Sequence, residues 1–342
     1  MRLRRSDLAG PGWTRRRRGK GFSYLDESGA VIRDADELDR IRALAIPPAW
    51  RDVWIAPYAH GHIQAVGTDD AGRRQYLYHP AWREQRDREK FDHVLEVARR
   101  LPRLRRRVRA DLRRRGLVRE RVLAAAVRLI DLGLFRVGGD EYAGGDEPTY
   151  GVATLRPEHV TSRRGCVEIA YPAKGGVEQR RTVTDPQVCA VVRALARGRA
   201  GDARLLAFRE RDGRWREVHS GDVNDYLREA TGADMTAKDF RTWHATVYAA
   251  AALARARGPA DGGAPSATAG RRMVAATVRE VAELLGNTPA VARSSYVDPR
   301  IVDLFHEGVT VPPASVDFPP GPGLEAAVLD TLDECSPGSQ GS

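Results

Sequence analysis

The residue pattern changes once along the chain, near residue 85, and this change limits the folds that the sequence can adopt. Residues 20 to about 90 hold short apolar runs separated by turn residues, which is typical of β-strands. From about Gln85 onward, glycine and proline become sparse and apolar residues recur at helical spacing. A chain of 342 residues is long enough for two domains. We therefore expect a small β-rich domain followed by a larger, mainly α-helical one.

Helical patterns cover most of the larger domain. They lie at residues 119–131, 185–197, 223–231, 239–257 and 271–285, and the last of them stops at Gly286. The glycine- and alanine-rich stretch 258–270 interrupts them and indicates a mobile loop. From Val311 onward, proline, glycine and serine with acidic residues predict a loosely docked or disordered tail.

One strand-like segment interrupts the helices, at about residues 159–183. Val167, Ile169 and Tyr171 alternate there, and residues 172–176 indicate a hairpin turn with Lys174 at its tip. The expected fold class is therefore α+β, with a small β-rich N-terminal domain and a larger helical domain that contains an inserted β-hairpin. The expected boundaries are 1–19 for a basic N-terminal arm, 20–90 for the β-rich domain, 91–312 for the helical domain and 313–342 for a Pro/Gly/Ser-rich acidic tail.

Positive charge is concentrated in one part of the chain. The formal net charge is +10, and residues 99–121 hold twelve arginines against only Asp111 and Glu120. Such a density of cations suits a protein that displaces counterions from a phosphate backbone. The alternative is a solvated helix face in an arginine-biased chain, since only four of the 56 basic residues are lysine. A lysine is therefore more informative here than an arginine.

Several classes of protein lack their usual sequence signals. No apolar run approaches the length of a membrane helix, and no apolar stretch follows the basic N-terminus, so a cytoplasmic protein is expected. Three cysteines without CxxC spacing argue against a disulfide framework or a structural zinc site. The motifs GxxxxGK[ST], GxGxxG after a strand, HExxH and GxSxG are absent. His60 and His62 have no suitably spaced carboxylate or cysteine, so we expect neither a metal nor a cofactor.

Several separate segments together resemble one known family. They occur in the family's order over roughly residues 20 to 310, and no one of them would suffice alone. They are IPPAWRDVWIAP, GRRQYLYHPAWR, LFRVGGDEYAGGDEPTYGVATLRPEHV, YPAKGG, KDFRTWHAT and LGNTPAVARSSYVDP. The chain resembles the type IB DNA topoisomerases, specifically their short bacterial and poxvirus-like branch. The resemblance implies a catalytic domain of the tyrosine recombinase and type IB topoisomerase fold, with the β-rich domain as a DNA clamp.

The resemblance implies a tyrosine nucleophile at Tyr296. Cutting DNA without metal or ATP requires a group that conserves the phosphodiester energy, and a phenol does this by forming a phosphotyrosine. A phenol is mostly protonated at neutral pH, so nearby positive charge is needed to favour the phenolate. Arg136 and Arg241 match the two family arginines that hold the non-bridging oxygens of the scissile phosphate.

Three further positions carry over from the family. Lys174 matches the hairpin lysine that gives its proton to the departing 5′-oxygen, and Lys238 matches a supporting lysine near the active centre. Asn287 stands where the viral enzymes carry a histidine that hydrogen-bonds a phosphate oxygen. Asparagine still donates a neutral hydrogen bond, so we expect catalysis to survive at a lower rate. The alternative for Asn287 is a helix-capping residue after Gly286.

The resemblance also implies the partner and the activity. The family positions that touch DNA match Arg73, Gln75, Tyr76, Tyr78 and Tyr142. The basic cluster at residues 15–20 and the arginine-rich window 99–121 would add phosphate contacts that do not read sequence. The expected enzyme is a monomer that closes as a clamp around double-stranded DNA in a bacterial nucleoid. It relaxes positive and negative supercoils through a covalent 3′-phosphotyrosyl nick, without ATP or a required metal.

Two alternatives of other classes remain open on the sequence. Tyrosine recombinases share the helical catalytic domain and its Arg, Lys, Arg and Tyr set, but usually place histidine where this chain has Lys238, and they lack the IPPAW and QYxYH segments. A DNA-binding protein with a decayed active site would keep the basic surface and lose catalysis, with Asn287 as its first sign.

Overall fold

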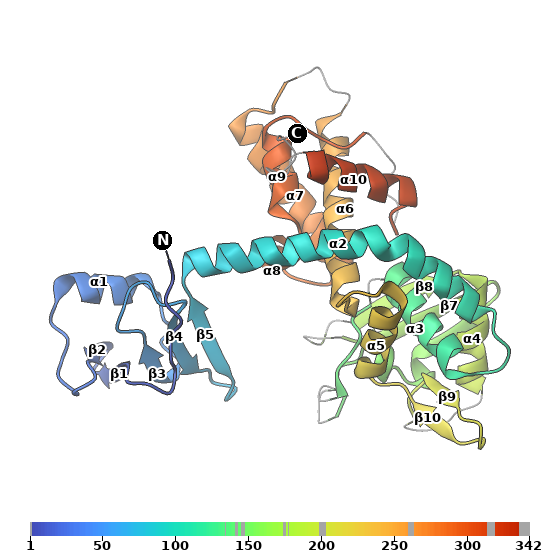
Figure 1. The fold of residues 1–342 in the computed structure, drawn as a ribbon, viewed down its shortest axis with the longest axis horizontal. Helices are drawn as coiled ribbons and strands as arrows, with labels where there is room; N and C mark the ends of the chain where they lie inside the picture. Colours follow the sequence, from blue (N-terminus) through green and yellow to red (C-terminus); the bar gives the residue numbers. More distant parts are fainter. Residues whose placement is uncertain are drawn as a thin grey trace. The chain divides into compact units, whose positions relative to one another are not determined.

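The computed structural model describes residues 2–133, 135–140, 143–144, 148–173, 176, 178–197, 203–258, 263–312 and 319–334. The chain divides into two compact units, Met1–Asp92 and His93–Ser342 (Figure 1). A five-stranded sheet forms most of the first unit and helices dominate the second, which confirms the α+β class. Among the described residues, no helix combines the length and the hydropathy needed to cross a membrane.

The first unit is an antiparallel sheet with one helix. The strand order is β2-β1-β3-β4-β5, and helix α1 (Ala35–Ala43) follows β2. The strands are β1 (Trp13–Arg18), β2 (Gly21–Leu25), β3 (Arg51–Ile55), β4 (Ile63–Thr68) and β5 (Arg74–Tyr78). Ile41 of α1 packs with Val53, Ile55 and Ala65 in a small apolar core.

Strand β1 was not predicted, because its arginine-rich sequence suggests a solvated arm. Arg15 points inward instead, and its guanidinium donates to the carbonyl oxygens of Ile46, Pro47 and Trp50 at 3.2, 3.1 and 2.6 Å. These bonds satisfy loop carbonyls that no strand partner reaches. Arginines in this run therefore contribute to the fold as well as to surface charge.

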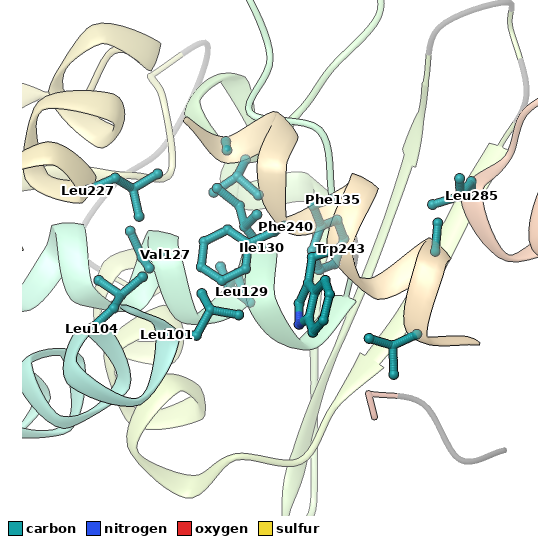
Figure 2. Close-up of a cluster of buried hydrophobic side chains, with 14 of the residues drawn as sticks. Leu101, Leu104, Val127, Leu129, Ile130, Phe135, Leu227, Phe240, Trp243 and Leu285 are labelled. Atoms are coloured by element: carbon teal, nitrogen blue, oxygen red, sulfur yellow. The ribbon is translucent and has the colours of Figure 1, made fainter. Parts of the chain in front are cut away.

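The second unit surrounds an apolar core built from several helices. Its helices are α2 (Pro80–Leu112), which begins in the first unit, α3 (Arg119–Gly133), α4 (Pro186–Arg197), α5 (Ser220–Thr231), α6 (Ala237–Arg257), α7 (Ala267–Leu285), α8 (Pro289–Ser295), α9 (Pro299–His306) and α10 (Pro322–Glu334). Figure 2 shows Leu101 and Leu104 of α2 in one cluster with Phe240 and Trp243 of α6 and with Ile130 of α3. Helix α6 is buried along most of its length, so side chains on it are held rigidly.

The predicted hairpin is present within a three-stranded sheet. Strands β6 (Val160–Arg163), β7 (Cys166–Pro172) and β8 (Glu178–Val183) pair in the order β6-β7-β8, all antiparallel. Val167, Ile169 and Tyr171 face the core, as their alternation predicts. A small hairpin of β9 (Ala207–Arg209) and β10 (Trp215–Glu217) completes the unit.

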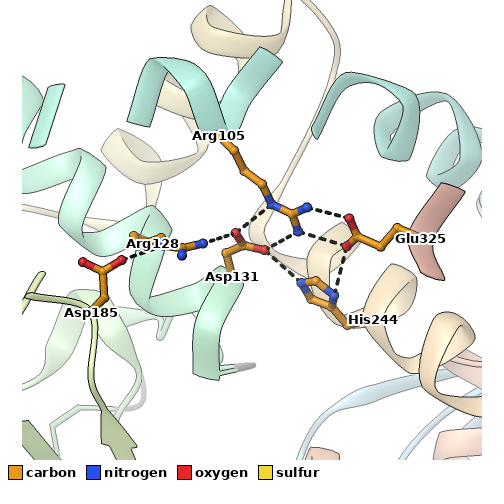
Figure 3. Close-up of polar contacts among 6 residues, drawn as sticks. All are labelled: Arg105, Arg128, Asp131, Asp185, His244 and Glu325. Carbon is orange, nitrogen blue, oxygen red and sulfur yellow. Dashed lines mark hydrogen bonds and ion pairs between the residues drawn. The ribbon is translucent and has the colours of Figure 1, made fainter. Parts of the chain in front are cut away.

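Helix α10 corrects the expectation of a loosely docked tail. Its Val328 and Leu332 are buried, and its Glu325 reaches a buried ion network (Figure 3). Arg105 of α2 donates to Glu325 at 2.5 and 3.0 Å and to Asp131 of α3 at 2.8 and 3.0 Å. Composition predicted disorder because the flanking residues are rich in proline and glycine, whereas the helix itself carries an apolar face.

His244 of α6 completes this network. It is fully buried, with Nε2 3.0 Å from Asp131 and Nδ1 3.7 Å from Glu325. Burial acts to raise the pKa of Asp131, but hydrogen bonds from His244 and Arg105 and their charges lower it well below its usual range. Asp131 is therefore a carboxylate throughout the physiological range, and the network joins α2, α3, α6 and α10.

Replacing Glu325 with alanine is expected to lower the free energy of unfolding by about 3–5 kcal/mol, because it leaves Arg105 buried with one counter-ion fewer. Urea denaturation followed by circular dichroism measures this change. Asp333→Ala is the matched control on the same helix, since Asp333 pairs with Arg99 at the surface, where an ion pair contributes about 1 kcal/mol or less. Equal losses in the two variants would contradict the burial of Glu325.

Candidate active site

A pocket of about 260 Å³ in the second unit brings distant segments of the chain together. Its lining comes from the segment after α3, the residues before β6, the start of α6 and the residue that follows α8. The residues are Arg136, Val137, Gly138, Gly139, Thr149, Tyr150, Ala237, Lys238, Arg241 and Tyr296. Three of the residues predicted to be catalytic, Arg136, Arg241 and Tyr296, therefore meet in one cavity.

Arg136 is positioned by a close crossing of two backbone segments. Its carbonyl oxygen accepts from Val152 N at 2.9 Å, and that of Val137 accepts from Ala153 N at 2.7 Å. The segments approach so closely that a Cβ on Gly138 would lie 2.8 Å from Gly151, and Gly138 has φ +83°. Only glycine fits both conditions. Gly138, two residues after Arg136, thus has a structural cause.

The C-terminal turn of α7, residues 284–287, orients both arginines. Arg241, which is 5% exposed, donates from Nη2 to the carbonyl oxygen of Leu285 at 2.8 Å. Arg136 donates from Nη2 to Oδ1 of Asn287 at 2.6 Å. Gly286 has φ +61° and ends the helix, and the backbone N–H of Asn287 bonds back to Ala282. Asn287 therefore caps α7 with its backbone and holds Arg136 with its side chain.

Tyr296 is fixed at the end of the next short helix. It follows α8, and its backbone N–H donates to Ala292 at 3.1 Å. The hydroxyl of Thr246, on α6, donates to the carbonyl oxygen of Tyr296 at 3.2 Å and accepts from the N–H of Asp298 at 3.1 Å. The phenol is 8% exposed, and its ring centroid lies 5.4 Å from the Arg241 guanidinium carbon.

The charges around Tyr296 favour its phenolate. Burial acts to raise its pKa, but the charges of Arg241 and Arg136, a hydrogen bond from Arg241 and the charge of Lys238 bring the pKa below its ordinary value. Tyr171, close to the same arginines, shows the opposite result, because burial raises its pKa to about 12. Burial, followed by the charge of Arg136, lowers the pKa of Arg241. The pocket thus combines a phenol of lowered pKa with two guanidinium cations. These cations repel each other, so a bound anion would stabilise them.

Comparison with known proteins assigns both parts of the chain to one family. Residues 79–303 match the family described as the catalytic core of eukaryotic DNA topoisomerase I, and residues 21–69 match the N-terminal domain of bacterial DNA topoisomerase IB. The chain belongs to the type IB DNA topoisomerases. It is also 29% identical, over 291 residues, to DNA topoisomerase 1B of Acanthamoeba polyphaga mimivirus, a match that covers 83% of this chain and 84% of the viral one. The family expected from the sequence is confirmed, and the chain is a DNA topoisomerase, an isomerase.

The structure describes only one of the two lysines predicted for the site of this topoisomerase. Lys238 lies in the first turn of α6, is exposed and lines the pocket beside Arg241. Asp239 of the same turn accepts from the N–H and the hydroxyl of Thr236, which fixes the start of α6. Lys174 lies outside the described residues, as does Tyr142, so both stay sequence predictions.

Gln75, Tyr76 and Tyr78, which are predicted to contact DNA, lie together on β5, and Arg73 directly precedes this strand. Tyr76 and Tyr78 are 37% and 36% exposed, and their rings stack with centroids 6.1 Å apart. Asp69 accepts from Arg73 and from Gln75 at 3.0 Å each, which orders the start of the strand. Exposed, stacked tyrosines on an ordered strand provide a flat surface with two hydroxyl groups.

The arginine-rich window 99–121 of this topoisomerase is only partly a free surface. Arg105 is buried in the ion network, and Arg107 and Arg114 both bind the buried Asp111 at 2.7 and 2.8 Å. Composition could not separate the arginines that pair with buried carboxylates from the exposed ones. The reason is that α2 buries one of its faces and exposes the rest of its surface. Among the described residues, the arginines in this window that stay exposed without a protein partner are Arg103, Arg106, Arg109, Arg113 and Arg115.

No cluster of three or more histidine, cysteine or acidic side chains in the described part of the chain could hold a metal ion. His62 has a structural contact, since its Nδ1 accepts from the N–H of Ser6 at 2.9 Å. The sequence analysis assigned no role at the pocket to Thr246 or to Tyr171. Both residues stand inside quoted family segments, KDFRTWHAT and YPAKGG, but the resemblance attached no function to either position.

Proposed function

We propose that this enzyme relaxes positively and negatively supercoiled double-stranded DNA by transient cleavage of one strand, without ATP or a required metal. One observation carries the proposal: Tyr296 lies in the pocket with Arg136 and Arg241, and their charges lower its pKa despite its burial. A tyrosine in this state is suited to attack a phosphodiester, and two guanidiniums are suited to hold the phosphate.

In the proposed cleavage, the phenol oxygen of Tyr296 bonds to phosphorus and the bond from phosphorus to the 5′-oxygen breaks. The pocket lining described here holds no carboxylate or imidazole, so the phenol proton passes to water. Arg136 and Arg241 bind the non-bridging oxygens and stabilise the charge of the transition state. Lys174 gives its proton to the departing 5′-oxygen, which would otherwise leave as a strongly basic alkoxide. The product is a 3′-phosphotyrosyl bond and a free 5′-hydroxyl.

Religation reverses these steps after the free end has rotated. One phosphodiester replaces another of similar energy, so the strain of the supercoil drives relaxation. The side-chain oxygen of Asn287 orients Arg136, and its amide nitrogen, which is buried, has no hydrogen-bond partner among the described residues. We propose that Asn287 supports the phosphate site through Arg136.

The first unit supplies the proposed hold on the duplex. Tyr76 and Tyr78 offer hydroxyls and ring faces. Gln75 lies beside them on β5, and Arg73 directly precedes the strand. Together with the exposed arginines of α2, they would contact phosphates and position DNA without reading its sequence. We propose that the enzyme acts as a monomer and closes as a clamp around the duplex.

Plasmid relaxation tests this function directly. Negatively and positively supercoiled plasmids are incubated with the enzyme in EDTA without ATP, and gels are run in detergent so that protein trapped on cut DNA remains visible. We expect both forms to relax and the protein to become linked to a 3′ end. Binding without relaxation would instead support the decayed DNA-binding protein, and strand exchange between two duplexes would support a recombinase.

A further inference from the structure

A third arginine binds the C-terminal turn of α7, from a third element of the fold. Arg181 of β8 donates from Nη2 to the carbonyl oxygen of Leu284 at 2.8 Å. The same turn accepts from Arg241 through Leu285 and from Arg136 through Asn287. The last carbonyls of a helix lack intrahelical partners and carry partial negative charge, so they suit cationic donors. The turn therefore joins the arginine pair of the active site to β8.

Arg181 is the charged member of the inward face of β8. Glu178, Arg180 and Thr182 are exposed, whereas Arg181 is half-buried and lies opposite the buried Ile169 in the hairpin register. Arg180, its neighbour, points outward and pairs with Glu168 and Glu178. An arginine on the core-facing side of a strand is costly to bury without partners. Arg181 donates to the carbonyl oxygen of its neighbour Arg180 at 3.2 Å and, outside the strand, to that of Leu284.

A second contact in the same place strengthens this link. A Cβ built on Gly286 would lie 2.6 Å from Nε2 of Gln179, the next inward residue of β8. Gln179 pairs in register with Tyr171 of β7. Strand β8 thus contacts the α7 turn through two successive inward residues. Because β8 is paired with β7, these contacts restrain the whole hairpin.

We propose that Arg181 is a positioning residue for cleavage: it holds the β7–β8 hairpin against the turn that orients Arg136 and Arg241. In the sequence, Lys174 lies between β7, which ends at Pro172, and β8, which begins at Glu178. Arg181 therefore fixes the position of the hairpin, which carries the proton donor, relative to the arginine pair. This inference rests on the proposed function, in which Lys174 protonates the leaving group.

A change in the leaving group separates this role from a general structural one. When sulfur replaces the bridging 5′-oxygen of the scissile phosphodiester, the bond from phosphorus to sulfur breaks and a thiolate departs. A thiolate is a much weaker base than an alkoxide and leaves without a proton. A defect caused only by a misplaced proton donor therefore disappears with this substrate, whereas a defect in phosphate binding or in the nucleophile stays.

The test measures single-turnover formation of the covalent adduct on matched duplexes with 5′-oxygen or 5′-sulfur. Arg181→Met is expected to react about 10- to 100-fold more slowly on oxygen, the loss typical of one hydrogen bond from a charged group. On sulfur it should come within roughly threefold of the unaltered enzyme, because no proton is needed. Lys174→Ala should show the same pattern with a larger loss on oxygen. Arg180→Met is the matched control on the same strand and should match the unaltered enzyme on both substrates.

The outcomes separate this inference from the function on which it rests. Rescue of both Lys174→Ala and Arg181→Met by sulfur supports the proposal, and Arg181→Lys should keep part of the rate on oxygen because it can still donate to Leu284. Rescue of Lys174→Ala but not of Arg181→Met overturns it, as does an Arg181→Met rate on oxygen equal to that of Arg180→Met. If sulfur rescues neither variant, the general-acid role of Lys174 fails, and the proposal fails with it. Thermal unfolding and DNA affinity of Arg181→Met, compared with Arg180→Met, show whether the fold is intact.

Discussion

Tyr296→Phe is expected to abolish the covalent protein–DNA adduct and to lower plasmid relaxation by about 10⁴-fold or more. The substitution removes only the phenol oxygen, which is the proposed attacking atom. The ring and its contact with the Arg241 guanidinium, 5.4 Å from the ring centroid, remain possible, so the pocket should keep its shape. DNA affinity, measured by fluorescence anisotropy on a labelled duplex, should stay close to that of the unaltered enzyme.

Tyr171→Phe is the matched control for this experiment. Tyr171 is buried near the same arginines, but its pKa of about 12 keeps it protonated, and it has no proposed role in the chemistry. This variant should retain activity within roughly threefold, as expected for a conservative change in the core. If Tyr296→Phe still forms an adduct, or if Tyr171→Phe loses it, the assignment of the nucleophile is wrong.

Arg241→Gln is expected to slow single-turnover cleavage by about 10²–10³-fold and to change its pH dependence. In the unaltered enzyme the pKa of Tyr296 is lowered, and Arg241 is the largest contributor to that lowering. A lowered pKa means that the phenolate forms at lower pH, so the rate should rise with pH and level off below the ordinary tyrosine value of about 10. Without Arg241 the pKa rises, and the ascending limb should move to higher pH.

The pH profile therefore gives a signature that a simple loss of folding would not give. The deficit of Arg241→Gln should be larger near neutral pH than at alkaline pH, where the phenolate forms without help. Arg255→Gln provides the control, because Arg255 lies on the same helix and pairs with Glu280 at the surface. A uniform loss at every pH would mean that Arg241 acts on the phosphate alone and not on Tyr296.

The part of the site that the sequence predicted is the part that lies in short, distinctive segments. Arg136, Arg241 and Tyr296 are far apart in the chain, and no periodicity indicates that they meet. Only the resemblance of their segments to a known family predicted that these residues share one site. In the structure all three line the same pocket. Gly286 was predicted as the end of a helix from local chemistry alone, because glycine readily adopts the left-handed conformation found there.

The parts that the sequence did not predict depend on partners distant in the chain. Arg15 and Arg105 look like other arginines, yet one satisfies loop carbonyls and the other is buried between two carboxylates. Arg181 belongs to an alternating strand, but its acceptor is a helix end about a hundred residues away. Composition does not distinguish one arginine from another. The roles of these residues can therefore be assigned only from the three-dimensional structure.

The α7 turn holds the guanidiniums of Arg136 and Arg241 with a side-chain amide oxygen and a backbone oxygen instead of carboxylates, and under the proposed function this links DNA binding to stability. A carboxylate would neutralise each cation and compete with a phosphate for it, whereas a carbonyl leaves the positive charge in place. The folded protein thus tolerates two neighbouring cations, one of them deeply buried, whose repulsion opposes folding until an anion arrives. Since a ligand that binds only the folded state stabilises it, we expect a duplex whose phosphate binds Arg136 and Arg241, as proposed, to offset their repulsion and stabilise the fold. The free energy of DNA binding and the free energy of folding are therefore coupled through this arginine pair.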